Sequence, residues 1–325
     1  MRHDDIPAPS QYLIIAGHGR SGSNRLLDAF DCHGDTFCRN EPNRPTGNPF
    51  LTLPDGFQPG LPSDFPAQWA AVINKASQQI SVRDRLVSDG KSFVRSPLRK
   101  FISRHVFLRK RPRQIAALVA PSFRLDTCPA IPYYAEPNSL ANIYPVLKVL
   151  LYSGWLIDAF YGDPRMKIIL NIREPKAFLR SWEHRYVRHA GPESVFQDNL
   201  QTLPAILAHF NAESCMPQSY SPRALFESEL WRWRYINEIL LETLGKEERF
   251  TTITYDAYDK APIEEIKRLY AFAGLTFDQE VEARAGLLRN TLFAPRAKQD
   301  YEHKDSIDAA VDTVLPGSSL QSFWA

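Results

Sequence analysis

Tyr12-Leu13-Ile14-Ile15-Ala16-Gly17-His18-Gly19-Arg20-Ser21-Gly22-Ser23-Asn24 is the stretch that decides the fold of this chain. An apolar run ends in a loop of glycines, hydroxyls and an arginine, and a helical pattern follows the loop. Backbone N–H groups of such a loop, with the N-terminus of the next helix, bind phosphate groups. The three glycines allow backbone angles and close approaches that a side chain would block. The stretch predicts a phosphate-binding loop between a strand at 12–16 and a helix at 23–31.

The loop departs from the nucleotide-triphosphatase pattern G-x-x-x-x-G-K-[ST] at its last two positions. Gly17 and Gly22 have the required spacing, but Ser23 replaces the lysine and Asn24 replaces the hydroxyl that holds Mg²⁺. We therefore expect a phosphate ligand other than ATP·Mg²⁺. Two alternatives stay open at this point. One is a P-loop nucleotide-dependent kinase, which Mg²⁺-dependent ATP turnover would favour, and the other is a plain strand–helix turn.

A second strand–helix unit carries another candidate for phosphate binding. Residues 167–172 are typical of a buried strand, and a helical pattern covers 176–188. Arg173 lies at the carboxyl end of the strand, where open α/β sheets bind ligands. Ser181 follows eight residues later, about two turns into the helix. The alternative for Arg173 is a surface ion pair with a neighbouring glutamate.

Together these segments resemble the sulfotransferase family, which uses 3′-phosphoadenosine 5′-phosphosulfate (PAPS). Residues 19–23 resemble the family's 5′-phosphosulfate loop in its R-S-G-[ST] form. Arg173 and Ser181 resemble the 3′-phosphate motif, with the same spacing of eight. Residues 229–278 resemble the helix, strand and helix that end the family's domain. Residues 43–140 show no match.

The resemblance implies an α/β fold with a parallel sheet flanked by helices, as in the P-loop NTPases and the sulfotransferases. It implies a single domain over residues 1–325, with an acceptor-binding loop and helical insertion at about 43–140. It also implies in-line transfer of a sulfuryl group from PAPS to an acceptor hydroxyl, which leaves 3′,5′-adenosine bisphosphate and needs no metal. Carbohydrate, peptide tyrosine and small-molecule alcohol all stay open as acceptors. A non-catalytic protein that binds adenosine bisphosphate on the same fold is a further alternative.

The resemblance also assigns residues to donor binding. Arg20 is the best candidate for the phosphosulfate, because its planar guanidinium can bind two oxygens and stays charged; we also expect it to take part in catalysis. Asn24 departs from the family's usual serine or threonine but keeps an N–H₂ donor. The full set expected to bind the donor is Gly19, Arg20, Ser21, Gly22, Ser23, Asn24, Arg173, Ser181, Arg296 and Lys298.

Two further residues are candidates for the chemistry of transfer. Glu41 resembles the base of the tyrosylprotein branch and of some bacterial carbohydrate sulfotransferases. The cytosolic branch uses a histidine two residues after a lysine, but here Lys148 is followed at that distance by Leu150. Lys148 is expected to neutralise charge on the bridging oxygen. The alternatives are a solvated glutamate and a strand-edge lysine, and His18 and His33 are rival bases.

The rest of the pattern predicts alternating strands and helices, hence a parallel sheet. Six prolines between 43 and 66 indicate a long loop or lid, and residues 67–120 have a mostly helical pattern. The remaining strands are expected at 36–38, 145–150 and 250–255, and the remaining helices at 153–161, 198–210, 224–245 and 262–273.

The composition of the chain limits the classes of partner that it is expected to bind. The chain has 325 residues and a net charge of +2, which does not favour nucleic-acid binding. No apolar run approaches the roughly 18 residues of a membrane span, and no signal-peptide pattern opens the sequence, so we expect a cytoplasmic protein without a transmembrane segment. The four cysteines lack metal-site spacing and fit reduced thiols. The sequence does not indicate the oligomeric state.

One segment has an unusual charge pattern. Residues 91–113 contain nine lysines and arginines and no acidic residue. Such a run is typical of a solvated basic helical face. The alternative is a docking surface for an anionic acceptor, and it predicts acceptor binding that weakens steeply with salt.

Overall fold

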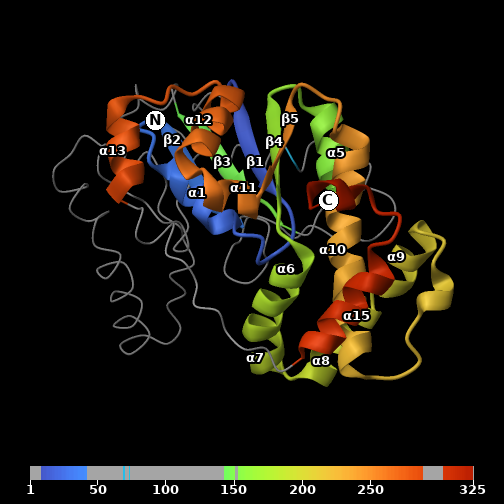
Figure 1. The fold of residues 1–325 in the computed structure, drawn as a ribbon. Helices are drawn as coiled ribbons and strands as arrows, with labels where there is room; N and C mark the ends of the chain where they lie inside the picture. Colours follow the sequence, from blue (N-terminus) through green and yellow to red (C-terminus); the bar gives the residue numbers. More distant parts are fainter. Residues whose placement is uncertain are drawn as a thin grey trace, which may run out of the picture.

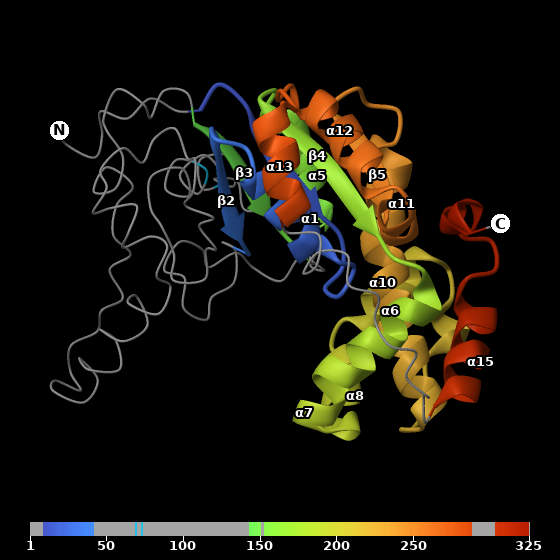
Figure 2. The same ribbon diagram turned by 60° about the vertical axis from the view of Figure 1, so that its left-hand side comes forward.

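The computed structural model describes residues 9–41, 69, 73, 143–150, 153–287 and 303–324. These residues form a five-stranded sheet with helices on both faces (Figures 1 and 2). All four pairs of neighbouring strands are parallel, which confirms the predicted α/β fold. The strands lie in the order β2-β3-β1-β4-β5, and their bounds are β1 (Tyr12–Ala16), β2 (Thr36–Asn40), β3 (Tyr144–Lys148), β4 (Met166–Ile172) and β5 (Phe250–Thr254).

The register of the sheet brings the predicted site residues to one edge. Ile15 of the central strand β1 pairs with Lys148 of β3 on one side and with Ile169 of β4 on the other. Asn40 of β2 pairs with Lys148 as well. Because the strands are parallel, their carboxyl ends lie at the same edge, where open α/β sheets bind ligands. The loop after β1, Glu41 and Arg173 therefore converge there.

Helices cover both faces of the sheet because the side chains of β1 alternate between two cores. Leu13 and Ile15 belong to the core formed with α1 (Ser23–Asp31), α12 (Pro262–Ala273) and α13 (Gln279–Leu287). Tyr12, Ile14 and Ala16 belong to the larger core on the other face. That face is covered by α5 (Ser153–Gly162) and α10 (Pro222–Leu244).

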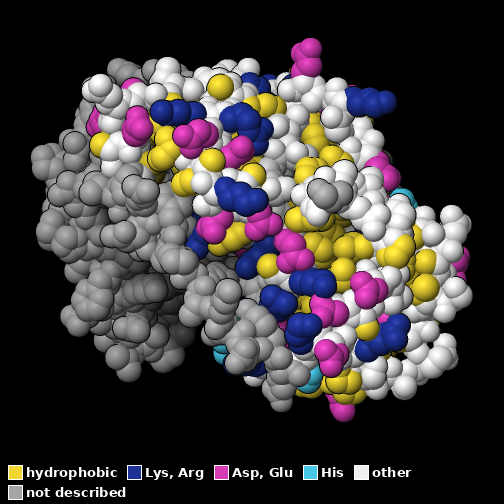
Figure 3. Space-filling view, viewed as in Figure 1, with side chains coloured by type: hydrophobic (Ala, Val, Ile, Leu, Met, Phe, Trp, Pro, Cys, Tyr) yellow, Lys and Arg dark blue, Asp and Glu magenta, His cyan; other side chains and the backbone are white. Residues whose placement is uncertain are grey.

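Beyond the carboxyl end of β4 the chain forms a helical layer (Figure 2). Lys176 of α6 and Lys304 of α15 each pair with Asp308 at 2.7 Å. The Lys176–Asp308 pair joins the two helices at the surface, and the Lys304–Asp308 pair lies within α15. Figure 3 shows basic and acidic side chains intermingled over one face of the molecule. The elements of the layer are α6 (Pro175–Trp182), η4 (Glu183–Val187), α7 (Arg188–Ala190), α8 (Pro192–Leu200), α9 (Leu203–His209), η5 (Glu213–Cys215), α15 (Lys304–Val314) and η6 (Ser319–Phe323).

The structure corrects three of the predicted elements. The single helix expected at 198–210 is wrong: α8 ends at Leu200 and α9 begins at Leu203, with Pro204 in its first turn. The helix expected at 176–188 changes to a π-helical turn in η4. The last strand ends at Thr254, whose side chain accepts a hydrogen bond from Ala257 N and so caps α11 (Tyr255–Lys260). Short capping segments of this kind leave no hydrophobic period in the sequence.

The predicted loop and helical insertion at 43–140 lie outside the described residues, except for Trp69 and Ile73. Both of these are helical and buried, and Trp69 Nε1 donates a hydrogen bond to the Tyr12 hydroxyl at 3.0 Å. The basic segment 91–113 lies wholly outside the described residues. Among the cysteines of the described part, Cys32 and Cys38 are buried free thiols and Cys215 is an exposed one.

Among the helices of the described ranges, none is both long enough and apolar enough to cross a bilayer.

Candidate active site

The loop after β1 has a strained backbone that makes room for a ligand. Gly17 and Gly22 have φ angles of 131° and 94°, in the left-handed region that favours glycine. A Cβ atom at Gly17 would lie 2.5 Å from Asn171 O, and one at Gly22 would lie 2.4 Å from a ring carbon of Tyr255. The third left-handed angle belongs to Arg20, at 73°, and not to Gly19. The expectation that all three glycines are needed for their backbone angles is therefore wrong for Gly19.

Arg20 joins the two predicted motifs. Its Nε donates to Ser181 Oγ of α6 at 3.2 Å, and its carbonyl oxygen accepts a hydrogen bond of 3.0 Å from Arg173 Nη1. Asn171 Nδ2 donates to the Ser21 carbonyl at 3.3 Å from the end of β4. The loop after β1 and the predicted 3′-phosphate motif thus contact each other directly, although they are about 150 residues apart in the sequence. Ser21 and Ser181 are buried, so both support the loop without lining the pocket.

Arg173 is placed by the start of α6 and by an aromatic ring. The Glu174 side chain caps α6, accepting hydrogen bonds from Lys176 N at 2.9 Å and Ala177 N at 2.6 Å, and Pro175 occupies the first turn. The Arg173 guanidinium carbon lies 4.7 Å from the centre of the Tyr255 ring, in cation–π geometry. This arrangement holds a cation at the carboxyl end of β4.

Glu41 and Lys148 meet at the ends of two neighbouring strands. Lys148 Nζ lies 2.8 Å from Glu41 Oε1 and donates to Asn24 Oδ1 at 2.5 Å. The Lys148 side chain is 3% exposed and the Glu41 side chain 13%. Glu41 has a φ of 52°, and its N–H donates to the Lys148 carbonyl at 2.9 Å. A left-handed non-glycine residue is a strained one, and such residues gather at functional sites.

These groups surround one pocket of about 130 Å³ that opens to solvent. Of the described residues that line it, four are cations and one, Glu41, is an acid. A pocket with this balance attracts an anionic ligand. The lining residues are Gly19, Arg20, Gly22, Ser23, Asn24, Arg25, Glu41, Lys148, Leu150, Arg173, Tyr186 and Tyr255.

The structure therefore brings most of the predicted site together. Arg296 and Lys298 lie outside the described residues. The rival bases do not line the pocket: His18 is buried behind the loop, and His33 is buried with its ring against Thr276 and the Asp35 amide.

Sequence reasoning missed Arg25, Tyr186 and Tyr255 among the lining residues. Tyr255 directly follows the carboxyl end of β5, a position that topology alone would have marked. Arg25 lies 5.2 Å from the Tyr255 ring centre and 3.3 Å from Asp259 Oδ1. Tyr186 lies in the π-helical turn, for which the sequence offers no signal.

Comparison with known proteins finds a family match for part of the chain. Residues 155–293 match the family model of the sulfotransferase domain, a stretch that includes Arg173, Ser181 and Tyr255. A search of curated proteins finds no match. The match confirms the resemblance that the motifs indicate. The match covers fewer than half of the residues of the chain and assigns a sulfotransferase domain to this part of it.

Solved structures that resemble the chain include further sulfotransferases at low identity. A sulfotransferase from Mycobacterium avium is 13% identical, with 97% of this chain and 78% of that one covered and a TM-score of 0.44. One from Alicyclobacillus acidocaldarius is 14% identical, with 94% and 92% covered and a TM-score of 0.42. A retinol dehydratase solved with androsterone and the inactive cofactor PAP is 10% identical, with 97% and 83% covered and a TM-score of 0.38. The family match over residues 155–293, not these likenesses, carries the assignment of a sulfotransferase domain.

Proposed function

We propose that this protein transfers a sulfuryl group from PAPS to an acceptor hydroxyl in the pocket at the carboxyl edge of the sheet. The observation that carries the proposal is the convergence of three features in one pocket. These are the Arg20 loop, the cation of Arg173 and the Glu41–Lys148 pair. A P-loop kinase needs a lysine where Ser23 stands, so the pocket favours phosphosulfate over ATP·Mg²⁺.

In this proposal the donor binds at two points. The phosphosulfate lies on the loop, where Arg20, the backbone N–H groups of 22–24 and the N-terminus of α1 supply donors and positive potential. Arg173 binds the 3′-phosphate, the group that distinguishes PAPS from ordinary adenine nucleotides. The hydrogen bond from Arg173 to the Arg20 carbonyl fixes the distance between the two binding points. Arg296 and Lys298 are proposed to add contacts to the 3′-phosphate.

Glu41 is the proposed base and Lys148 the proposed stabiliser of the leaving group. The acceptor oxygen attacks sulfur while Glu41 takes its proton. The bond between sulfur and the bridging oxygen breaks, and the electron pair stays on 3′,5′-adenosine bisphosphate. The Lys148 ammonium group is placed to neutralise the charge that develops on that oxygen. As in phosphoryl transfer, the rate would come mainly from positioning and charge stabilisation.

The part of the proposal that concerns acceptor binding involves residues outside the described ranges. We propose one domain in which residues 43–140 form the acceptor-binding insertion. The arginine loop and the glutamate base favour a carbohydrate or a peptide tyrosine over a lipid-like alcohol. The basic run at 91–113 would suit an anionic acceptor, whose KM should then rise steeply with salt. A salt-independent acceptor KM would contradict a role for this run.

The test is a turnover assay with PAPS and a panel of sugars, tyrosine peptides and small alcohols. Release of 3′,5′-adenosine bisphosphate, followed by chromatography, should require both an acceptor and an intact Glu41. Mg²⁺-dependent consumption of ATP in place of PAPS would revive the kinase alternative. Tight binding of the bisphosphate with no release under any acceptor would support the non-catalytic alternative.

A further inference from the structure

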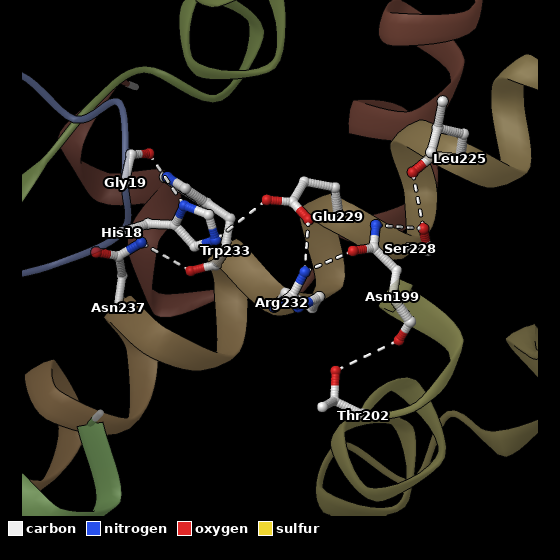
Figure 4. A network of polar contacts seen from close by, with 10 residues as sticks. All are labelled: His18, Gly19, Asn199, Thr202, Leu225, Ser228, Glu229, Arg232, Trp233 and Asn237. Carbon is white, nitrogen blue, oxygen red and sulfur yellow. Dashed lines mark hydrogen bonds and ion pairs between the residues drawn. The ribbon is translucent and has the colours of Figure 1, made fainter. Parts of the chain in front are cut away.

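A second acidic side chain lies on the other side of the phosphate loop from the pocket. His18 is buried, and its ring lies between two oxygens (Figure 4). Its Nδ1 is 3.0 Å from the Gly19 carbonyl oxygen, and its Nε2 is 3.2 Å from Glu229 Oε1 on α10. The edge of the ring packs on Phe178 of α6, with ring centres 4.8 Å apart. A side chain of the loop itself is therefore held on both sides, by the next residue of the loop and by Glu229 of α10.

The two contacts of His18 differ in kind. The Gly19 carbonyl oxygen accepts hydrogen bonds, so Nδ1 carries the hydrogen of this contact. Nε2 lies 3.2 Å from Glu229 Oε1, within ion-pair distance but without hydrogen-bond geometry. The Nδ1 bond orients the Gly19 carbonyl within the loop, and the Glu229 contact joins the ring to α10.

Glu229 is itself held by a chain of contacts that crosses to another helix (Figure 4). Its Oε2 lies 3.1 Å from Arg232 Nη1, which also donates to Asn199 Oδ1 of α8 at 2.5 Å. Asn199 Nδ2 donates to Ser228 Oγ at 3.0 Å. Glu229 is 1% exposed and Asn199 fully buried. Because these groups hold one another, the carboxylate that His18 contacts has a fixed position.

The geometry of the peptide bond links this network to the pocket. In a trans peptide the C=O of one residue and the N–H of the next point in opposite directions. The Gly19 carbonyl faces His18 behind the loop, so the Arg20 N–H is directed toward the opposite side. Gly19 and Arg20 both line the pocket, and Arg20 holds its strained φ of 73°. Such strain persists where surrounding contacts over-determine the backbone.

We propose that His18 and Glu229 are positioning residues that hold the peptide between Gly19 and Arg20 in its donor-binding orientation. The identity of the ligand that the loop binds, phosphosulfate, rests on the function proposed above. The orientation of the loop does not rest on that function, because it is a property of the protein without ligand. Neither side chain touches the donor. They act through the Gly19 carbonyl.

The test measures backbone hydrogen exchange of the peptide that covers residues 17–25, without ligand, in four variants. Glu229→Ala removes the carboxylate, while Glu229→Gln can donate to Nε2 and leave Nδ1–H for the Gly19 carbonyl. His18→Phe keeps the ring and its packing but removes both nitrogens. The matched control is Glu238→Ala: this glutamate lies on the same helix, is 2% exposed, and pairs with Arg234 at 2.6 Å and with Ser319 N at 2.6 Å.

We expect exchange in the loop to become about tenfold faster in Glu229→Ala and His18→Phe. It should stay within about twofold of wild type in Glu229→Gln and in the control, even though Glu238→Ala lowers the melting temperature. Unchanged loop exchange in His18→Phe would overturn the proposal. Equal acceleration in Glu238→Ala, or equal acceleration in Glu229→Gln and Glu229→Ala, would do the same.

Donor affinity separates this inference from the proposed function. If wild type binds 3′,5′-adenosine bisphosphate, the Kd should rise about tenfold in Glu229→Ala and His18→Phe and stay near wild type in Glu229→Gln. Failure of wild type itself to bind the bisphosphate would refute the proposed function and leave the exchange result standing. Faster loop exchange without any change in Kd would overturn the claim that this orientation is the donor-binding one.

Discussion

Glu41 and Glu229 lie on opposite sides of the same loop, and each is paired with a basic side chain. Glu41 directly follows β2, lines the pocket and pairs with Lys148 at 2.8 Å. Glu229 lies within α10, behind the loop, and pairs with His18 at 3.2 Å. The exposed fraction of the side chain is 13% for Glu41 and 1% for Glu229. Similar local chemistry therefore permits different roles: Glu41 can take a proton from a ligand, whereas Glu229 can act only through the loop.

The largest expected effect comes from removing the charge of Glu41. In Glu41→Gln we expect turnover to fall roughly 10²–10⁴-fold, the usual contribution of a general base. The Kd for 3′,5′-adenosine bisphosphate should change less than about threefold, since the amide keeps the shape of the side chain. Steady-state release of the bisphosphate and calorimetry measure the two quantities. Turnover within tenfold of wild type would mean that the pocket glutamate is not the base.

Lys148→Met should give the next largest effect. Methionine keeps an unbranched stem but removes the ammonium group that is proposed to stabilise the leaving group, so turnover should fall roughly 10²–10³-fold. Lys167→Met is the matched control, because Lys167 is a half-buried strand lysine at the start of β4 that donates to the Phe272 carbonyl at 2.8 Å. An equal loss of turnover in both variants would indicate a general effect on the sheet.

Gly22→Ala tests the loop between the two glutamates. The added Cβ meets the Tyr255 ring at 2.4 Å, and φ at this residue is 94°. We expect the Kd for the bisphosphate to rise at least about tenfold and the melting temperature to fall by about two to four degrees. In the control, Gly162→Ala, the new methyl group meets nothing within 4 Å. A donor affinity that survives Gly22→Ala would show that the ligand does not depend on this loop.

Ser181→Ala should have the smallest effect. It removes the hydroxyl that accepts a hydrogen bond of 3.2 Å from Arg20 Nε, while Arg173 still contacts the Arg20 carbonyl. Loss of one such bond, worth about 1 kcal/mol, should raise the bisphosphate Kd about five- to tenfold and leave kcat nearly unchanged. Calorimetric titration with 3′,5′-adenosine bisphosphate measures this change in Kd. A fall in kcat larger than the rise in Kd would give Ser181 a part in the transition state.

Local signals explain what the sequence could predict. The apolar run at 12–16 and the glycine loop predict β1, the loop and α1, because strand, turn and helix follow each other directly. The strand before Arg173 and the proline after it mark the edge of the sheet where Arg173 lies. The glutamate and lysine of the pocket were found through a family resemblance, and the parallel register of β2 and β3 explains why they meet.

What the sequence could not predict depends on distant partners. His18 and Glu229 are separated by 211 positions, and no local period indicates that α10 passes behind the loop. Tyr186 reaches the pocket from a π-helical turn, whose irregular hydrogen bonding leaves the amphipathic pattern of a helix unchanged. The break between α8 and α9 does have a local signal, because Pro204 occupies the first turn of α9.

The central claim, a site built for PAPS, is tested most directly by calorimetric titration with 3′,5′-adenosine bisphosphate, AMP and ATP·Mg²⁺ on wild type and Arg173→Ala. We predict tight binding of the bisphosphate and much weaker binding of AMP. In Arg173→Ala the bisphosphate affinity should fall roughly 10–100-fold, to a value near that of AMP. Equal affinity for the bisphosphate and AMP in wild type, or tighter binding of ATP·Mg²⁺, would contradict the account.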